Sequence, residues 1–278
     1  MSSIIEVRHL CKSFRSGRGL GKGSISRAVD DVSFTVERGT TFGLVGESGS
    51  GKSTTARIVV RLLDADSGNV LLDGQELLGL RGRELFRVRR RVQMVFQDPF
   101  ASLDPRWKVG SLVAEGIRIH KLRPRAEQPD RAAEILELCG LSADVARQYP
   151  HEFSGGQRQR IGVARALAVE PEVLVLDEPI SALDVSIQAQ ILNLLAELQE
   201  RLSLTYVFIS HDLAIVERFC DQIAVMSEGR IVERGSPQTL YNAPAHEYTR
   251  TLLSAVPVPD PRRRRQRVPR EARDEVRP

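Results

Sequence analysis

The sequence predicts an α/β fold with a parallel sheet at its core, an antiparallel β portion and an inserted helical portion. Two apolar strands, Val173–Leu176 and Thr205–Ile209, flank a long amphipathic helix, an order typical of a parallel sheet with right-handed crossovers. Segments near the N-terminus alternate apolar and polar residues, which indicates antiparallel strands with one solvated face. Between residues 98 and 168 the pattern changes to helices.

The N-terminal part of the chain is predicted to be mainly β structure with one helix. Ile4–Leu10 and Val32–Val36 alternate apolar and polar residues, whereas Thr41–Val45 is mostly apolar and is expected to be a buried strand. A helix is expected over Lys52–Leu63. The other elements predicted here are a Gly-rich basic loop at Gly17–Gly23, short strands at Val70–Leu72 and Val92–Phe96, and a hairpin turn at Asp73-Gly74.

The rest of the chain is predicted to contain helices and a final pair of strands. Apolar residues recur at helical spacing from Ile187 to Leu202, which predicts the long amphipathic helix between the two core strands. Ile223–Met226 and Arg230–Glu233 are expected to pair through a turn at Glu228-Gly229. The helical portion comprises Gly110–His120, Asp130–Cys139 and Gln157–Ala168.

The composition is that of an ordinary globular protein with one basic end. Of the 278 residues, 41% are hydrophobic and 27% are charged. The formal net charge of +4 lies in residues 257–278, which carry eight Arg and four acidic residues, so the remainder is about neutral and does not indicate nucleic-acid binding. We predict one folded domain over 1–258 and a disordered basic tail over 259–278. Contact of this tail with anionic lipid is the alternative.

The sequence does not favour a membrane-spanning, secreted or disulfide-rich protein. No apolar run approaches the roughly 18 residues that a membrane-spanning helix needs. Residues 1–6 lack a basic region followed by an apolar stretch, so we expect no secretory signal there. Cys11, Cys139 and Cys220 lie far apart and indicate neither a disulfide framework nor a metal site, which suits a reducing cytosol.

Gly46–Ser53 matches the pattern G-x-x-x-x-G-K-[ST] and lies between a predicted strand and a predicted helix. Glycines let successive N–H groups turn toward one anion, and the helix N-terminus adds partial positive charge. Lys52 would bind the β- and γ-phosphates of a nucleoside triphosphate, and the Ser53 hydroxyl would bind Mg²⁺. The alternative is an ordinary Gly-Ser turn. The predicted nucleotide-binding residues are Gly46, Glu47, Ser48, Gly49, Ser50, Gly51, Lys52, Ser53 and Thr54.

Two strand ends bring acidic and imidazole side chains to the same edge of the predicted sheet. Asp177 and Glu178 follow Val173–Leu176, and His211 follows Thr205–Ile209. The carboxyl ends of parallel strands are where α/β proteins bind ligands, so we expect Asp177 to hold Mg²⁺ through water. Each signal is weak alone, because acids are common at strand ends and a lone histidine is more often structural.

A further string, Ser154–Gln157, precedes a predicted helix and could by itself be a helix cap. Together with Gly46–Ser53, Leu174–Glu178 and Ser210–Asp212 in this order, it makes the chain resemble the nucleotide-binding subunit of an ATP-binding-cassette (ABC) transporter. The match runs from about residue 4 to residue 258. The resemblance implies the ABC ATPase fold, with a P-loop NTPase sheet, an antiparallel β subdomain and a helical subdomain at about 98–168, and it implies ATP and Mg²⁺ as ligands.

The resemblance also implies catalytic roles. Glu178 resembles the family's general base, which polarises the attacking water, and His211 resembles the residue that senses the γ-phosphate. Gln97 resembles the glutamine that contacts Mg²⁺ and the attacking water. The implied metal ligands are Ser53, Gln97 and Asp177.

A composite site between two subunits is a further implication. In the family, ATP held by one subunit is contacted by the other through residues that match Ser154, Gly155, Gly156 and Gln157 here, so two subunits are needed. Ser181, Ala182, Leu183 and Asp184 resemble the loop that crosses the dimer seam. Phe14 stands where the family places an aromatic residue that stacks on adenine. The alternative is that Phe14 packs beneath the first sheet.

Two segments resemble the ATPases of oligopeptide/dipeptide importers. Gln97–Arg106 is one, although Asn is common where Asp104 stands. The other is Tyr241–Pro257, in which Glu247 replaces a usual Pro; a C-terminal region of this type is expected over about 236–258. Two further departures, Phe153 for Leu and Ile180 for Thr, lie outside the expected phosphate contacts.

The resemblance implies the partners and the location. Many paired ATPases of this group carry a C-terminal cysteine cluster, which this chain lacks, so we expect it to work beside a different, cysteine-bearing ATPase subunit. Two membrane permease subunits, and indirectly an extracytoplasmic solute-binding protein, complete the importer at the cytoplasmic face of the cell membrane, where this chain is peripheral. The segment after Gln97 lies where relatives receive a short helix from the membrane subunit.

Two alternatives remain open. Nickel importers share the same pattern, so the cargo could be nickel or another small solute. A soluble ABC ATPase that acts on DNA or ribosomes is the competing class. Such proteins carry two cassettes, zinc-binding cysteines or a long coiled coil, and this sequence shows one cassette and neither of the other features.

Overall fold

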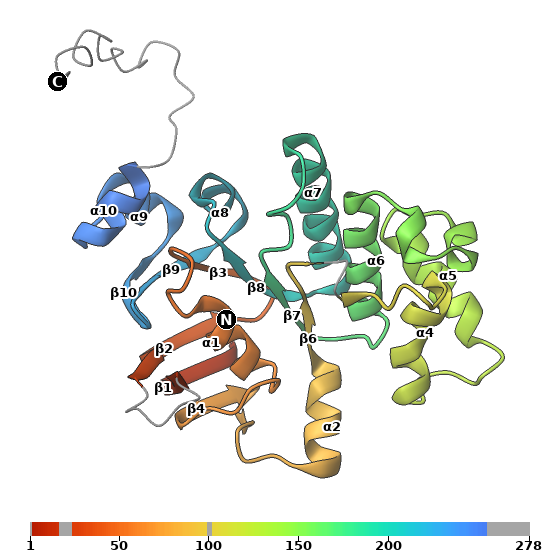
Figure 1. Cartoon of the computed structure of the whole chain (residues 1–278), viewed down its shortest axis with the longest axis horizontal. Helices are drawn as coiled ribbons and strands as arrows, with labels where there is room; N and C mark the ends of the chain where they lie inside the picture. The colour runs from red at the N-terminus through yellow and green to blue at the C-terminus, as the bar shows by residue number, and fades with distance from the viewer. Residues whose placement is uncertain (1, 17–23, 99–101, 255–278) are drawn as a thin grey trace, which may run out of the picture.

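The computed structural model describes residues 2–16, 24–98 and 102–254 (Figure 1). The predictions made for Gly17–Gly23, for residues 99–101 and for the basic tail at 259–278 lie outside the described residues. Within the described ranges, no helix combines the length and the apolar composition that crossing a bilayer requires.

A six-stranded sheet in the order β10-β9-β3-β8-β7-β6 lies at the centre of the molecule. Five neighbouring strands run parallel, and β10 pairs antiparallel with β9 at one edge. This arrangement confirms the predicted α/β fold. The strands are β3 Thr41–Val45, β6 Val92–Val95, β7 Val173–Asp177, β8 Thr205–Ser210, β9 Gln222–Ser227 and β10 Arg230–Gly235.

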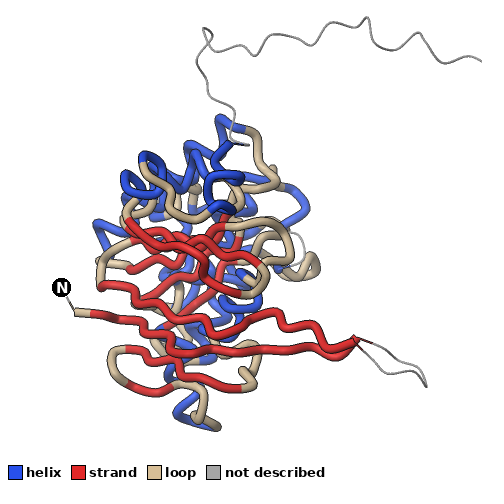
Figure 2. Tube along the Cα trace, turned by 90° about the vertical axis from the view of Figure 1, so that its left-hand side faces the viewer, coloured by secondary structure: helices blue, strands red, loops and turns tan. Residues whose placement is uncertain are grey.

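A second, antiparallel sheet has the order β2-β1-β4-β5. β1 (Ser3–Ser16) and β2 (Ser24–Glu37) are far longer than the predicted strands and form a ribbon whose end projects from the rest of the molecule (Figure 2). Register shifts flank Leu10, and His9 and Asp31 have positive φ values of 49° and 56°. These bulges break the alternation on which the shorter prediction depended.

The predicted hairpin turn at Asp73-Gly74 is confirmed. β4 (Ser67–Leu72) pairs with β5 (Gln75–Glu76), and both turn residues have positive φ values, 51° and 78°. Two consecutive residues of this kind form the turn whose twist matches that of the flanking strands.

The structure describes five helical segments between β6 and β7, and they lie together at one end of the molecule (Figure 1). They surround buried residues such as Val113, Leu136 and Ile161, which belong to the same apolar cluster. α7 (Val185–Leu202) then crosses from β7 to β8, as predicted. The five segments are α4 Val109–Ile119, α5 Gln128–Leu138, η1 Ala143–Arg147, η2 Pro150–Glu152 and α6 Gly155–Leu167.

Several helices were not predicted. α2 (Gly82–Arg91) contains five arginines and buries only Val88, so it lacks a clear apolar stripe. α1, which is Lys52–Val59, ends before the predicted Leu63 because the chain turns at Arg61, where φ is 59°. The remaining ones are too short to show a helical period: α8 Leu213–Phe219, α9 Pro237–Asn242 and α10 Glu247–Ser254.

The central sheet is covered on both faces. Leu174 and Leu176 of β7 join the apolar cluster that contains the helical end, whereas Val173 and Val175 join the cluster that contains the antiparallel sheet. All five residues of β7 are buried, which explains its nearly continuous apolar sequence. Because both faces are packed, the loops at the carboxyl edge start from fixed positions.

Candidate active site

The carboxyl edge of the central sheet brings most of the predicted site residues together. Gly46 follows β3, Asp177 ends β7 and His211 follows β8, while Gln97 comes two residues after β6. They surround one pocket beside the loop at Gly46–Ser53, called the phosphate loop below. Its lining residues are Ala28, Gly46, Glu47, Ser48, Gly49, Gly51, Lys52, Ser53, Thr54, Gln97, Glu178, His211 and Leu252.

The phosphate loop can be built only with glycine at two positions. Gly46 has φ +148°, and a Cβ there would lie 2.1 Å from the carbonyl oxygen of Met226. Gly51 has φ +105°, and its Cβ would lie 2.1 Å from the carbonyl oxygen of Ala28. These contacts explain the glycines at both ends of the motif, because any side chain would displace the loop from its neighbours.

Lys52, the first residue of α1, is buried against the phosphate loop. Its Nζ donates hydrogen bonds to the carbonyl oxygens of Gly46 and Glu47, both at 2.7 Å. Burial lowers the pKa of Lys52, and the neighbouring carboxylates, chiefly Glu178, oppose that shift. The amine is therefore held by backbone carbonyls at the base of the pocket, where it can exchange them for phosphate oxygens.

The side-chain oxygens of Ser53 and Asp177 lie within hydrogen-bond distance of each other. The Ser53 hydroxyl donates to the Asp177 carboxylate at 2.8 Å across the gap between α1 and β7. Burial raises the pKa of Asp177, while the hydrogen bond from Ser53 opposes the shift. Hydroxyl and carboxylate oxygens are ligands that Mg²⁺ accepts, so the pair fits the metal predicted here. No group of three or more His, Cys, Asp or Glu suited to a metal occurs in ranges 2–16, 24–98 and 102–254.

Glu178 lies between an amide and an imidazole. Gln97 Nε2 donates to one oxygen of the Glu178 carboxylate at 2.9 Å, and His211 Nδ1 lies 3.2 Å from the other. Glu178 also has φ 46°, a left-handed conformation that is uncommon outside glycine and recurs at functional sites. The three residues predicted to be catalytic therefore form one cluster at the mouth of the pocket.

Ser154–Gln157 forms the start of α6 and lies outside this pocket. The Ser154 hydroxyl accepts from the Gln157 N–H at 3.4 Å, and the Gln157 side chain accepts from the Ser154 N–H at 3.0 Å, which is a capping box. A Cβ at Gly155 would lie 3.2 Å from Leu183, so this string packs against Ser181–Asp184. The two predicted dimer segments are thus neighbours and separate from the phosphate loop of their own chain.

Phe14 lies on β1 with its side chain 42% exposed, so it does not pack beneath the sheet. Lys12 Nζ lies 5.7 Å from the ring centroid. Phe14 is not among the residues that line the pocket. Its role toward adenine stays a prediction.

We expect Phe14→Ala to weaken ATP binding about five- to tenfold, because base stacking on an aromatic ring contributes about 1 kcal/mol or more. Binding of inorganic tripolyphosphate, which has no base, should not change. Calorimetric titration of both ligands checks the prediction, and Phe14→Tyr is the matched control. An equal loss for both ligands would show that Phe14 acts only on the fold.

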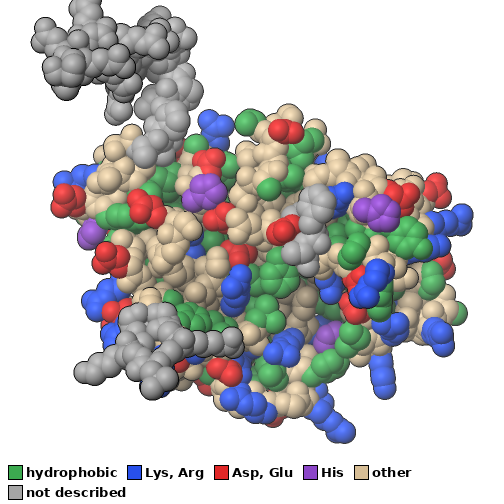
Figure 3. Space-filling view, in the orientation of Figure 1, with side chains coloured by type: hydrophobic (Ala, Val, Ile, Leu, Met, Phe, Trp, Pro, Cys, Tyr) green, Lys and Arg blue, Asp and Glu red, His purple; other side chains and the backbone are tan. Residues whose placement is uncertain are grey.

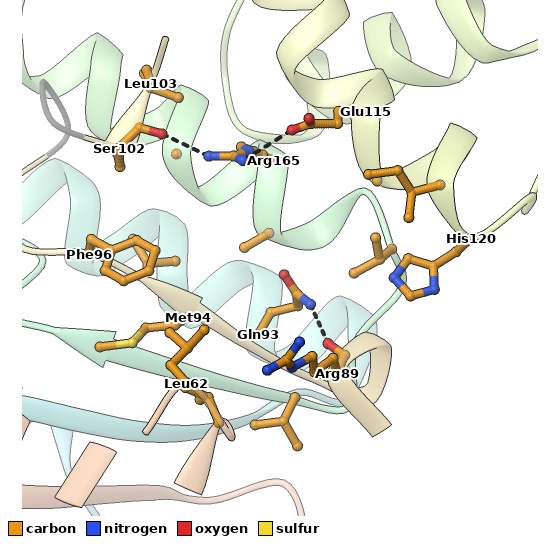
Figure 4. Close-up of a pocket in the computed structure, with 18 of the residues that line it drawn as sticks. Leu62, Arg89, Gln93, Met94, Phe96, Ser102, Leu103, Glu115, His120 and Arg165 are labelled. Carbon is orange, nitrogen blue, oxygen red and sulfur yellow. Dashed lines mark hydrogen bonds and ion pairs between the residues drawn. The ribbon is translucent and has the colours of Figure 1, made fainter. Parts of the chain in front are cut away.

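A second cavity, of about 270 Å³, opens between β6 and the helices α4 and α6 (Figure 4). Leu62 and Ile119 line it with 54% and 50% of their surface exposed, and Arg165 bridges Glu115 at 3.1 Å and the Ser102 carbonyl at 2.7 Å. Figure 3 shows hydrophobic side chains gathered on this face between α2 and the helical end, with Lys and Arg around them. We call this cavity the groove.

The pocket beside the phosphate loop also contains residues that the motifs did not indicate. Ala28 contributes from β2, and Leu252 contributes from α10. Tyr248, which does not line the pocket, accepts a hydrogen bond from the Glu47 N–H at 3.0 Å. No sequence pattern pointed to these contacts, because they join segments far apart in the chain.

Comparison with known families and relatives agrees with this geometry. Residues 29–181 match the family model described as ABC transporter, and residues 232–277 match that described as oligopeptide/dipeptide transporter, C-terminal region. The chain is 52% identical over 267 residues to the oligopeptide transport ATP-binding protein OppF of Bacillus subtilis, covering 95% of this chain and 86% of the relative. It is 49% identical over 269 residues to the dipeptide transport ATP-binding protein DppF of Lactococcus lactis subsp. cremoris, and the match covers 96% of this chain and 85% of the relative.

Solved structures show the same fold. CbiO1 of Clostridium perfringens, part of the ABC transporter complex cbiONQ, superposes with a TM-score of 0.74 at 29% identity, covering 87% of this chain and 92% of that chain. The ATP-binding cassette MJ0796, as a dimer in a post-hydrolysis state bound to ADP and Pi, superposes with a TM-score of 0.73 at 29% identity, covering 84% and 98%. With the ABC transporter model matching more than half of its length, this chain belongs to the ABC transporter family as an ATP-binding subunit that hydrolyses ATP.

Proposed function

We propose that this chain powers the import of oligopeptides or dipeptides, as one of two different ABC ATPase subunits that close around ATP and drive two separate permease subunits. The match of residues 232–277 to the C-terminal region of oligopeptide/dipeptide transporters carries this proposal. Relatives named for oligopeptide and dipeptide transport support it, at 49% to 52% identity over nearly the whole chain. ABC ATPases of importers dimerise and work with permease subunits, and transport ATP-binding subunits are peripheral membrane-associated proteins. We place this one at the cytoplasmic face.

We assign the chemistry of hydrolysis to the cluster at the mouth of the pocket. Glu178 is the general base for the attacking water, because its carboxylate is the one that Gln97 and His211 orient. Lys52 and the N–H groups of the phosphate loop bind the phosphates. Ser53, Asp177 and Gln97 would hold Mg²⁺, which would neutralise charge on the phosphate oxygens.

Dimerisation follows from where Ser154–Gln157 lies. Since this string is outside the pocket of its own chain, a partner's copy must complete the site if the string is to contact ATP. Its neighbours Ser181–Asp184 would then lie at the seam. A second, cysteine-bearing ATPase subunit is our expected partner.

We assign the groove to the permease. Among the residues that the structure describes, five of the nine exposed large hydrophobic ones lie in it or beside it, and such a gathering marks an interaction site. An amphipathic helix laid into an apolar groove is a common recognition mode. The five residues are Leu62, Phe86, Phe96, Trp107 and Ile119.

Gly162 offers a selective test of this docking. It lies on α6 and lines the groove, and a Cβ there would meet no atom within 4 Å. We expect Gly162→Leu to fill the groove and abolish recovery of permease subunits, while ATP binding by the isolated subunit changes less than about twofold and the helix gains stability. Gly79→Leu, at an open position outside the groove, is the matched control.

The experiment uses tagged Glu178→Gln protein, purified with ATP and Mg²⁺ from native membranes, with and without Gly162→Leu. Two permease chains and a second ATPase should copurify when Gly162 is intact, and only the permease chains should be lost in Gly162→Leu. Recovery of a homodimer without a membrane partner would overturn the importer. Uptake of a labelled tripeptide into vesicles that contain the complex identifies the cargo, and uptake of nickel in its place would exclude peptide import.

A further inference from the structure

We propose that α10 completes the ATP site of this subunit, with Tyr248 as a positioning residue for the phosphate loop and Leu252 as part of the pocket wall. The proposal rests on ATP binding at Gly46–Ser53. It adds a contribution from residues 232–277, the region matched by the peptide-transporter model and not by the ABC transporter model.

Both contacts come from one face of α10. The Tyr248 hydroxyl accepts a hydrogen bond from the Glu47 N–H at 3.0 Å, and Leu252, four residues later, lines the nucleotide pocket. Residues four apart lie on the same side of a helix, so Tyr248 and Leu252 can reach the site together. Figure 1 shows α10 at the end of the molecule opposite to α4–α6.

The position of α10 does not depend on Tyr248. Glu233 of β10 accepts hydrogen bonds from the N–H groups of Ala245 and His246, at 2.8 Å and 2.9 Å. The Arg250 side chain donates to the Ala245 carbonyl at 2.8 Å, and Thr249 is buried. Removal of the Tyr248 hydroxyl should therefore leave the helix in place and delete one contact to the loop.

That contact restrains the part of the loop to which Lys52 is bonded. Lys52 Nζ donates to the carbonyls of Gly46 and Glu47, and at least one of its three N–H groups must turn to phosphate when ATP binds. The far end of the loop keeps its own restraint, a hydrogen bond of 3.0 Å from the Gly229 N–H to the Ser50 carbonyl. Once Lys52 has moved, the Tyr248 hydroxyl still holds the Glu47 backbone. Because a restrained loop loses less conformational freedom on binding, ATP should bind more tightly.

Tyr248→Phe is the direct test. We expect the affinities for ATP and ADP to fall about three- to tenfold, as for loss of one neutral hydrogen bond, and KM to rise by a larger factor than kcat falls. Loss of this bond should lower the melting temperature without nucleotide only slightly, and the rise produced by ATP should be smaller than in the parent protein. Leu252→Ala should weaken binding about two- to fivefold through lost apolar contact.

Tyr241→Phe is the matched control. Tyr241 lies on α9 in the same C-terminal region, and its hydroxyl donates to the Leu213 carbonyl of α8, away from the loop. Nucleotide affinity should be unchanged in this variant. Equal affinities in Tyr248→Phe and the parent protein, or equal losses in both tyrosine variants, would overturn the proposal. Failure of the parent protein itself to bind ATP would instead overturn the proposed function.

Discussion

Replacing Glu178 with Gln is expected to slow ATP hydrolysis by about 10²–10⁴-fold, the usual share of a general base. Gln keeps the shape of the side chain and can still bond to Gln97, so the mouth of the pocket should keep its form. It cannot accept a proton from water. Single-turnover hydrolysis by the dimer in its membrane complex measures the effect.

ATP binding by the Glu178→Gln variant should be retained, and the closed dimer should accumulate with ATP. Glu197→Gln, an exposed substitution on α7, controls for the loss of a negative charge and should hydrolyse ATP at the parent rate. A turnover near the parent value in Glu178→Gln would remove Glu178 from the mechanism. Normal binding with slow turnover separates the chemical step from nucleotide recognition.

Replacing Lys52 with Met should weaken ATP binding about 10- to 100-fold, because a charged hydrogen bond to phosphate is lost. Turnover at saturating ATP should fall about 10²- to 10³-fold, since the charge that develops on the phosphates loses a fixed cation. Equilibrium titration with a fluorescent ATP analogue and steady-state hydrolysis measure the two effects.

The fold should survive the Lys52→Met substitution. Burial already lowers the pKa of Lys52, which means that holding its charge there costs free energy, and an apolar chain of similar length removes that cost. The carbonyls of Gly46 and Glu47 lose their donor at the same time, so the melting temperature without nucleotide should change by no more than a few degrees. Lys108→Met, at an exposed position before α4, is the control and should bind ATP normally. Loss of structure in the Lys52 variant would contradict this argument.

The parts of the site that adjoin strands could be predicted from the sequence. Gly46–Ser53, Asp177 and His211 each follow an apolar strand directly, and the carboxyl ends of parallel strands meet at one edge, so local patterns place them together. The Gln97–Glu178 hydrogen bond joins two such strand ends. The positions of these residues at strand ends therefore predicted most of the residues that line the pocket.

The contacts made by α10 could not be predicted in the same way. Tyr248 and Glu47 are 201 residues apart in the chain, and α10 has only eight residues, too few for a clear helical period. The exposed position of Phe14 depends on the long β1–β2 ribbon. The bulges at His9 and Asp31 interrupt the alternation of apolar and polar residues, so the sequence pattern does not reveal the length of this ribbon. In each case a nonlocal packing arrangement decides the outcome, and no local residue pattern records it.

α6 joins two functional regions that have been described separately. Its first turn carries Gly155 and Gly156, which the partner's nucleotide would contact, and Gly162 and Ala166 from its later turns form a wall of the groove. An α-helix of 13 residues is about 20 Å long and bends little over that distance. Its two ends must therefore move together. A rotation that nucleotide imposes on Gly155 and Gly156 at the seam would also displace Gly162 and Ala166 in the wall of the groove.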